Sequence, residues 1–223
     1  AIALLLGPPD AMAPAFGVDS FRRHLLGARV ACLKPRIVEL PGLGGRASFA
    51  SFVIRFNEKL PVTTAGRGDV EIALLGHVLD PLRPGRTNAE IVSGLSHSST
   101  FPALEDAWSG LAGRWAAFVR IGAELRLYPD AAGSKSVFHS GAWMASQPGL
   151  LGYEPSTALD VFPGATNWPV GVMPFPGVRQ LTPNHYLDLR NQREVRFAPG
   201  PIRSVGLEEA AATIAELLQG TIH

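Results

Sequence analysis

The sequence predicts a strand-rich α+β domain with mainly antiparallel sheets, and three observations predict it. Two pairs of extended segments are each joined by a short turn, which is typical of β-hairpins. Only three stretches show the spacing of an amphipathic helix. Hydrophobic residues make up 46% of the 223 residues and charged residues 17%, which provides a sizeable core and excludes a disordered chain.

Two hairpins account for four of the predicted strands. The first joins residues 115–121 to 124–128 through Gly122-Ala123, and alternate side chains of each strand point to opposite faces. The second joins residues 185–189 to 193–197 through a three-residue turn. Three further segments are predicted to be extended: residues 29–40, 51–56 and 70–75, the last of which ends at Gly76.

Three helices are predicted. Thr87 and Glu90 form the capping-box pattern of a helix start, in which each side chain satisfies the other residue's N–H. A second helix is predicted to stop at Gly113, and its apolar face consists of Phe101, Leu104, Trp108 and Leu111. A third covers residues 207–222, with two glutamates in its first turn. Its apolar stripe, which needs a partner, consists of Leu207, Ala211, Ile214, Leu218 and Ile222.

Charge and cysteine content exclude several classes of protein. A net charge of +1 with scattered arginines is not the footprint of a nucleic-acid binder. The only cysteine, Cys32, excludes an internal disulfide framework and a multi-cysteine zinc site. No apolar stretch approaches the roughly 20 residues of a membrane helix. The start of the chain lacks the features of a signal peptide, so we expect a soluble, cytoplasmic protein without a metal.

Three stretches, in order along the chain, resemble the asparagine-synthetase family. Residues 125–138, LRLYPDAAGSKSVF, are similar to the family's strand, aspartate–glycine turn and second strand with an aromatic end. Residues 104–119 are similar to the helix-to-strand passage before it, and residues 177–187 to the hairpin that closes the glutaminase domain. The resemblance covers residues 70–222, whereas residues 1–69 match poorly.

The resemblance implies a four-layer α-β-β-α sandwich of two mainly antiparallel sheets, the fold of the N-terminal-nucleophile hydrolases. Residues 1–203 would form a class II glutamine amidotransferase-like domain. Residues 204–223 would form a linker helix towards an ATP-binding synthetase domain that is absent from this chain. The residues that the resemblance marks as structural parts of its motifs are Asp130, Gly133, Lys135, Pro183 and His185.

The glutaminase chemistry of this family does not carry over to the matching positions. The family's nucleophile is a cysteine at the mature N-terminus, whose place is taken here by Ala1. Leu75 replaces the asparagine that donates to the oxyanion beside the retained Gly76, and losing one such donor lowers the rate by about 10²–10³. Asn88 replaces the aspartate that pairs with the α-ammonium group of glutamine, while Glu90 is retained. We therefore expect a vestigial glutamine site and no catalytic residue.

Other polar residues are predicted to be structural. Asp130 should organise its turn by side-chain bonds to backbone N–H groups. Lys135 beside Gly133 is predicted to be an exposed turn lysine rather than an anion ligand. His77 and His139 lie near motif positions, and each is predicted to be a structural histidine.

The leading functional hypothesis is the N-terminal part of an ATP-dependent amide-bond-forming enzyme that has lost its glutaminase activity. Its domain would support structure or substrate binding, for a small-molecule, peptide-cyclising or polysaccharide-modifying reaction. ATP and Mg²⁺ would bind only the absent synthetase domain, in the same or a separate chain, and a homodimer is a possible assembly. The alternatives are a free-standing binding or scaffold domain, and an active glutamine-dependent asparagine synthetase whose N-terminus is misplaced.

Overall fold

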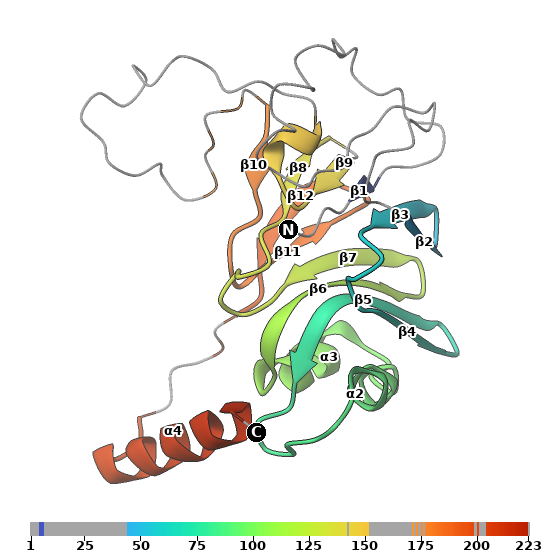
Figure 1. Ribbon diagram of the computed structural model, residues 1–223. Coiled ribbons are helices and arrows are strands. Elements are labelled where there is room, and N and C mark those ends of the chain that lie inside the picture. The colour runs from blue at the N-terminus through green and yellow to red at the C-terminus, as the bar shows by residue number, and fades with distance from the viewer. Residues whose placement is uncertain are drawn as a thin grey trace, which may run out of the picture. The chain divides into compact units, whose positions relative to one another are not determined.

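A computed structural model describes residues 5–6, 44–141, 143–151, 171, 173, 175, 177–198, 200 and 204–222. Within these residues the chain has three α-helices and two six-stranded sheets in which every strand pair is antiparallel (Figure 1). The predicted class, α+β with two mainly antiparallel sheets, is confirmed. Ala1, Cys32 and the extended segment predicted at 29–40 lie outside the described residues.

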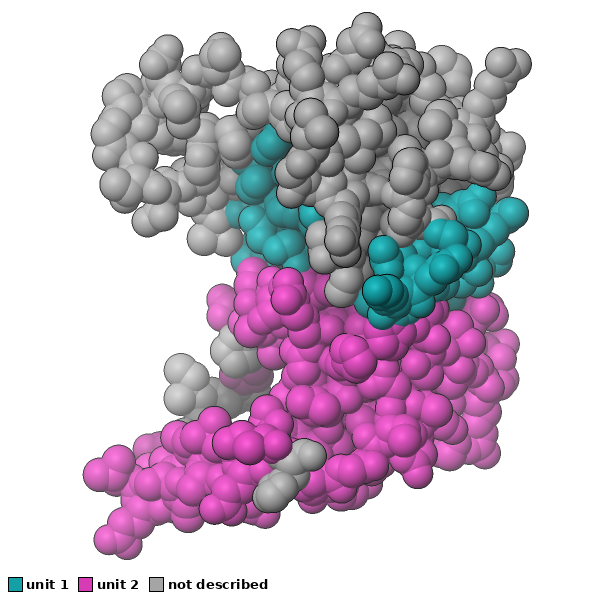
Figure 2. All heavy atoms as spheres, viewed as in Figure 1, with its two compact units in different colours: residues 1–60, 136–182 teal, residues 61–135, 183–223 magenta. Residues whose placement is uncertain are grey.

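The chain divides into two compact units, which Figure 2 shows in different colours. Unit 1 comprises residues 1–60 and 136–182, and unit 2 comprises residues 61–135 and 183–223. The chain therefore passes from one unit to the other three times, after residues 60, 135 and 182. The candidate residues described below, apart from His139, belong to unit 2.

The sheet of unit 2 has the strand order β12-β11-β7-β6-β5-β4. Its strands are β4 (Val62–Arg67), β5 (Val70–Leu79), β6 (Ala112–Ile121), β7 (Glu124–Pro129), β11 (His185–Asp188) and β12 (Arg193–Arg196). Both predicted hairpins are confirmed as β6–β7 and β11–β12, and β11 pairs with β7 to join them. Local sequence patterns were sufficient for these pairs because a short turn fixes the partner of each strand.

Two helices lie against one face of this sheet, α2 (Asn88–Leu95) and α3 (Phe101–Ser109) (Figure 1). Apolar side chains of both helices and alternate residues of the strands form the core of unit 2. Its buried members include Ile72, Leu74, Val78, Ile91, Leu95, Leu104, Trp108, Trp115, Ala117, Val119 and Tyr128. The capping box at the start of α2 is as predicted, and Ile91 and Leu95 of this helix are buried against the sheet.

The second helix ends earlier than the sequence predicts. Helix α3 stops at Ser109 and is capped by Gly110, whereas Gly113 lies inside β6. Leu111 is therefore not part of the helical face. The N–H of Leu111 donates to the carbonyl of Trp108 in the turn that leads into the strand.

Strand β5 also runs further than predicted, through Gly76 to Leu79. Gly76 has a φ angle of 114° and Gly113 on the neighbouring strand has 110°. A Cβ atom on Gly76 would overlap the carbonyl of Arg114, and one on Gly113 would overlap the carbonyl of His77. The two glycines allow β5 and β6 to remain paired where their backbones come close, so Gly76 continues the strand instead of ending it.

The last helix, α4 (Leu207–Ile222), has the predicted extent. None of its described residues is buried, and its apolar stripe remains exposed at Leu207, Ile214, Leu218 and Ile222. Its last turn lies against the loop after β5, because a side chain at Gly220 would overlap the carbonyl of Pro81.

Unit 1 contains the second sheet, with the strand order β10-β8-β9-β1-β3-β2. Its described elements are β1 (Leu5–Leu6), β2 (Gly45–Phe49), β3 (Phe52–Phe56), β8 (Phe138–Ser140), β9 (Trp143–Ala145), the 3₁₀ turn η1 (Pro148–Leu151) and β10 (Arg179–Gln180). The segment predicted at 51–56 is confirmed as β3, which pairs with β2 across a tight turn. Phe49, Phe52 and Ile54 are buried in this unit.

Candidate functional site

Gly76 and Asn88, two of the four positions that the resemblance assigns to a glutamine site, meet where α2 begins beside β5. Asn88, the first residue of α2, donates from Nδ2 to the carbonyl of Gly76 at 2.8 Å. Its Oδ1 accepts from the N–H of Val78 at 3.1 Å. One amide thus bridges a donor and an acceptor of the same strand, a pairing that a carboxylate cannot make because it has no donor.

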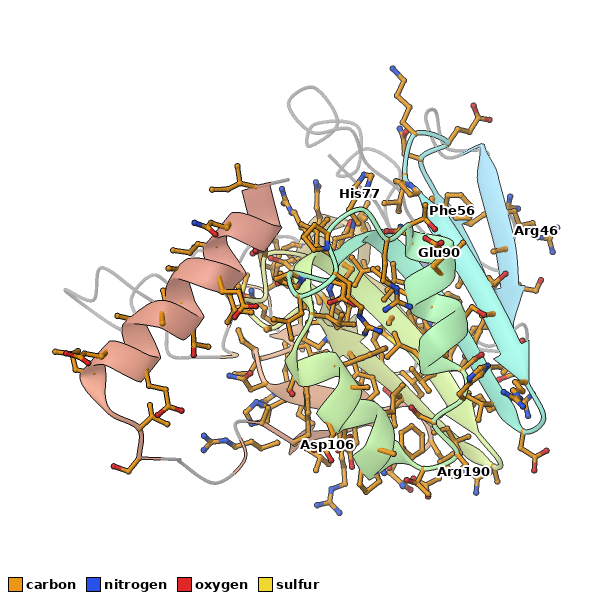
Figure 3. The ribbon with its side chains drawn as sticks, turned by 90° about the horizontal axis from the view of Figure 1, so that it is seen from below. Arg46, Phe56, His77, Glu90, Asp106 and Arg190 are labelled. Atoms are coloured by element: carbon orange, nitrogen blue, oxygen red, sulfur yellow. The ribbon has the colours of Figure 1, made fainter. Side chains whose placement is uncertain are left out.

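Gly76 and Leu75, at the predicted oxyanion position, also lack a free hydrogen-bond donor in the groups that would face an oxyanion. The N–H of Gly76 donates to the carbonyl of Pro61 at 2.9 Å. Leu75 is fully buried and its side chain has no polar atom. This part of β5 therefore offers no free donor from the Gly76 N–H or the Leu75 side chain. His77, which Figure 3 labels beside this region, is exposed.

Glu90 is held in the capping box of α2 (Figure 3). Its Oε2 accepts from the Thr87 N–H at 2.7 Å and from the Thr87 hydroxyl at 2.8 Å. These bonds lower the pKa of Glu90. The carboxylate is thus assigned to helix capping, in agreement with the structural reading of this residue.

A buried carboxylate fixes the loop that presents Asn88. Asp80 accepts from Arg83 Nε at 2.9 Å and from Arg86 Nη1 at 2.8 Å. Arg86 also donates to the carbonyl of Glu90 at 2.9 Å, which ties the loop to the first turn of α2. Burial would raise the pKa of Asp80, but the hydrogen bond from Arg86 and the charge of Arg83 outweigh it, and the pKa is lowered.

The turn at Asp130 brings the structural motif residues together. The buried Asp130 carboxylate accepts three backbone N–H groups, from Ala132 at 3.2 Å, Ser134 at 2.9 Å and Lys135 at 2.7 Å. Asp130 therefore organises the turn, as predicted.

Gly133 and the segment before β11 complete this turn. Gly133 has a φ angle of 63°, and a Cβ atom there would lie 2.7 Å from Pro183 Cγ. His185 Nδ1 lies 3.0 Å from the carbonyl of Pro183, which orients the first residue of β11. The sequence motif is thus a compact junction between the end of β7 and the start of β11.

Lys135 is not the exposed turn lysine that the sequence predicts. Its relative exposure is 3%, and its Nζ has no hydrogen-bond partner. Desolvation and the charge of Arg114 lower the pKa of Lys135 to about 8, against the opposing charge of Asp130. The prediction was wrong because turn residues are usually solvated, whereas the burial of this side chain depends on distant contacts that local sequence does not reveal.

Sequence reasoning missed a cation–aromatic cluster on α3 and the sheet of unit 2. The guanidinium of Arg126 lies 3.7 Å from the ring centroid of Phe101 and 4.1 Å from that of Tyr186. Glu105 accepts from Arg126 at 3.0 Å and from the Tyr128 hydroxyl at 2.7 Å. Burial, followed by the hydrogen bond to Glu105, raises the pKa of Tyr128.

This cluster is closed rather than open to a ligand. Every charged group in it has a partner, since Arg126 also donates to Glu124 at 2.9 Å. Rings of Trp108, Tyr128 and Phe197 pack edge to face beside it. We assign it to the joining of α3, β7 and β11. Its only sequence signal was the alternation of Glu124, Arg126 and Tyr128 with leucines, which places the three on one face of the strand.

Metal-binding and membrane-spanning features were also sought. Among the described residues, no three His, Cys, Asp or Glu side chains are grouped so that they could hold a metal ion. His139 is buried in β8 of unit 1. No helix in the described part of the chain is both long and apolar enough to cross a membrane.

Comparison with known proteins assigns no family. No protein-family model matches the chain, and a search of curated proteins finds no match.

Proposed function

We propose that this chain is the N-terminal part of an asparagine-synthetase-like, ATP-dependent amide-bond-forming enzyme in the cytoplasm, and that its glutaminase activity has been lost. The observation that supports the loss of glutaminase activity is the Asn88 amide, whose oxygen and nitrogen both bond to the backbone of β5. This amide is neutral and both of its polar atoms are bonded to β5, so it lacks the negative charge that would pair with the ammonium group of glutamine. The N–H of Gly76, which is bonded to Pro61, supports the same conclusion for the oxyanion.

The first half of the proposal is supported by the order of three structural features. Helix α3 leads into β6, β7 ends in the Asp130 turn, and β11 begins beside that turn at Pro183 and His185. These are the segments whose sequences resemble the asparagine-synthetase family. The exposed apolar stripe of α4 fits a linker helix that packs on a further domain. ATP and Mg²⁺ would bind that domain.

A direct assay tests the loss of glutaminase activity. We expect that the chain, incubated with glutamine, releases no more glutamate than buffer does. Glutamate release well above this background would overturn the claim and favour an active amidotransferase. A second test is to read the coding sequence beyond His223 for an SGGxDS pyrophosphate loop. A stop codon at that place would contradict a ligase in which both domains belong to one chain.

A free-standing binding domain is the second candidate, and the exposed α4 stripe also favours it. The two candidates differ in one measurement on the natural full-length protein, the exchange of pyrophosphate into ATP in the presence of carboxylic acids. Exchange would support the ligase. If no exchange occurs with a broad set of acids, and the protein has no pyrophosphate loop, the result would favour the free-standing binding domain.

A further inference from the structure

The Lys135 ammonium group is a buried cation without an acceptor. Its Nζ is shielded from solvent and makes no hydrogen bond to any residue that the structure describes. An ammonium group has three donors, and leaving them unpaired in a desolvated position is strongly unfavourable. Buried polar groups are nearly always satisfied, so an unsatisfied one calls for a specific explanation.

The carboxylate of Asp130, whose charge acts on Lys135, does not accept a hydrogen bond from its Nζ. Asp130 uses both oxygens for the N–H groups of its own turn, including that of Lys135. Among the described residues, Lys135 forms no ion pair with Asp130 or with any other acid. The carboxylate therefore offsets part of the ammonium charge at a distance without occupying its donors.

Arg114 adds a second positive charge to the same place. Its Nε donates to the carbonyl of Ser134 at 3.0 Å, which holds the guanidinium beside the turn that carries Lys135. Arg114 is exposed and makes no ion pair among the described residues. Its charge lowers the pKa of Lys135, so the two cations repel each other. Two cations and one carboxylate leave a local excess of positive charge.

We propose that Lys135 and Arg114 bind a small oxyanion, a carboxylate or a phosphate group, beside the Asp130 turn. An oxyanion would accept the unpaired donors of Lys135 and relieve its repulsion with Arg114. Carboxylate and phosphate share this chemistry, and the experiment below separates them. The proposal does not depend on the proposed function, since a binding domain and a ligase could equally carry the site.

The chain has only three lysines, Lys34, Lys59 and Lys135, which permits a direct measurement. Lysine labelled at Cε and Nζ gives one NMR signal for each, and K135M and K59M assign two of them. Inorganic phosphate and, separately, acetate are added to the full chain at constant ionic strength, so that general screening does not change. We expect a saturable shift of the Lys135 signal and a rise in its pKa, with no shift of Lys59. A shift with phosphate only would identify a phosphate site, and a shift with acetate would identify a carboxylate site.

Two arginine variants sharpen the test. We expect R114M to weaken anion binding about fivefold, as for a partly exposed charge. R67M is the matched control, because Arg67 is an exposed strand arginine, and it should leave the affinity unchanged. A Lys135 signal that ignores both anions, or that moves only in step with Lys59, would overturn the proposal. If K135M proves unstable, R114M and R67M still decide it.

Discussion

Asn88 illustrates how one side chain can be fixed by structure at a position where the family that the sequence resembles has a ligand-binding aspartate. An aspartate there would keep the acceptor for Val78 but lose the donor to the Gly76 carbonyl. We expect Asn88→Asp to lower the free energy of unfolding by about 1–3 kcal/mol, because the Gly76 carbonyl would face a carboxylate instead of an N–H donor. Urea denaturation would measure the change.

Asn57→Asp is the matched control for this substitution. The Asn57 side chain uses only Oδ1, which accepts from the N–H of Lys59 at 2.9 Å, and an aspartate keeps that bond. We expect its effect to stay within about 0.5 kcal/mol. Equal effects of the two substitutions would show that the hydrogen bond from Asn88 Nδ2 to the Gly76 carbonyl does not contribute to stability.

Lys135 gives a pH dependence whose sign can be worked out. Its pKa falls from 10.5 to about 8 on folding, chiefly by desolvation. Between these pH values the unfolded chain holds the proton and the folded chain releases it, so the stability of the wild type rises with pH. Relative to K135M, the unfolding free energy should rise by at most about 3 kcal/mol between pH 8 and 10.5.

Below pH 8 the ammonium group is charged in both states, and K135M should be the more stable protein. Urea denaturation from pH 7 to 10.5, in a buffer without oxyanions, would measure the difference. K59M provides the control, because Lys59 is exposed and its removal should not change the slope. A flat difference between wild type and K135M would contradict the buried state of Lys135.

At the scale of elements, Gly76 of β5 and Gly113 of β6 allow the two paired strands to approach closely. Gly76→Ala would combine a backbone angle of 114° with overlap of the Arg114 carbonyl. We expect a loss of about 3 kcal/mol or more in the free energy of unfolding, because strain and overlap add. Thermal or urea unfolding would show the loss.

Gly68→Ala separates the two contributions. Gly68 also has a positive φ angle, 59°, but a Cβ atom there would meet nothing within 4 Å. We expect a loss of about 1 kcal/mol from the backbone angle alone. A Gly76 variant no less stable than the Gly68 variant would show that the strands separate easily at this point.

The sequence predicted those helices and strands whose starts, ends or turns are marked by a few neighbouring residues. Thr87 and Glu90 mark a helix start within four residues, and Gly122 marks a hairpin turn between its own strands. Gly76 was predicted to end a strand and Gly113 to end a helix, but each lies inside a strand, because its pairing depends on the strand that lies opposite. The burial of Lys135 and the Arg126 cluster depend on segments distant in sequence, so no local pattern could specify them.

At the scale of the whole molecule, the two units are each assembled from two separate stretches of chain. In unit 2 the Asp130 turn, Pro183 and His185 join the two stretches, and β11 adds to β7 immediately afterwards. The motif that carries the family resemblance is thus the point where the unit closes.

Helix α4 belongs to unit 2 but adds little to its core. None of its described residues is buried, whereas Leu104 of α3 is fully buried. We expect a chain that ends at Ser204 to lose less than about 1 kcal/mol of unfolding free energy, because exposed residues contribute little to stability. Leu104→Ala should lose about 2–5 kcal/mol by leaving a cavity. Urea denaturation compares the two directly. A truncated chain as unstable as the Leu104 variant would mean that α4 packs on this chain, and it would remove the argument that its apolar stripe serves another domain.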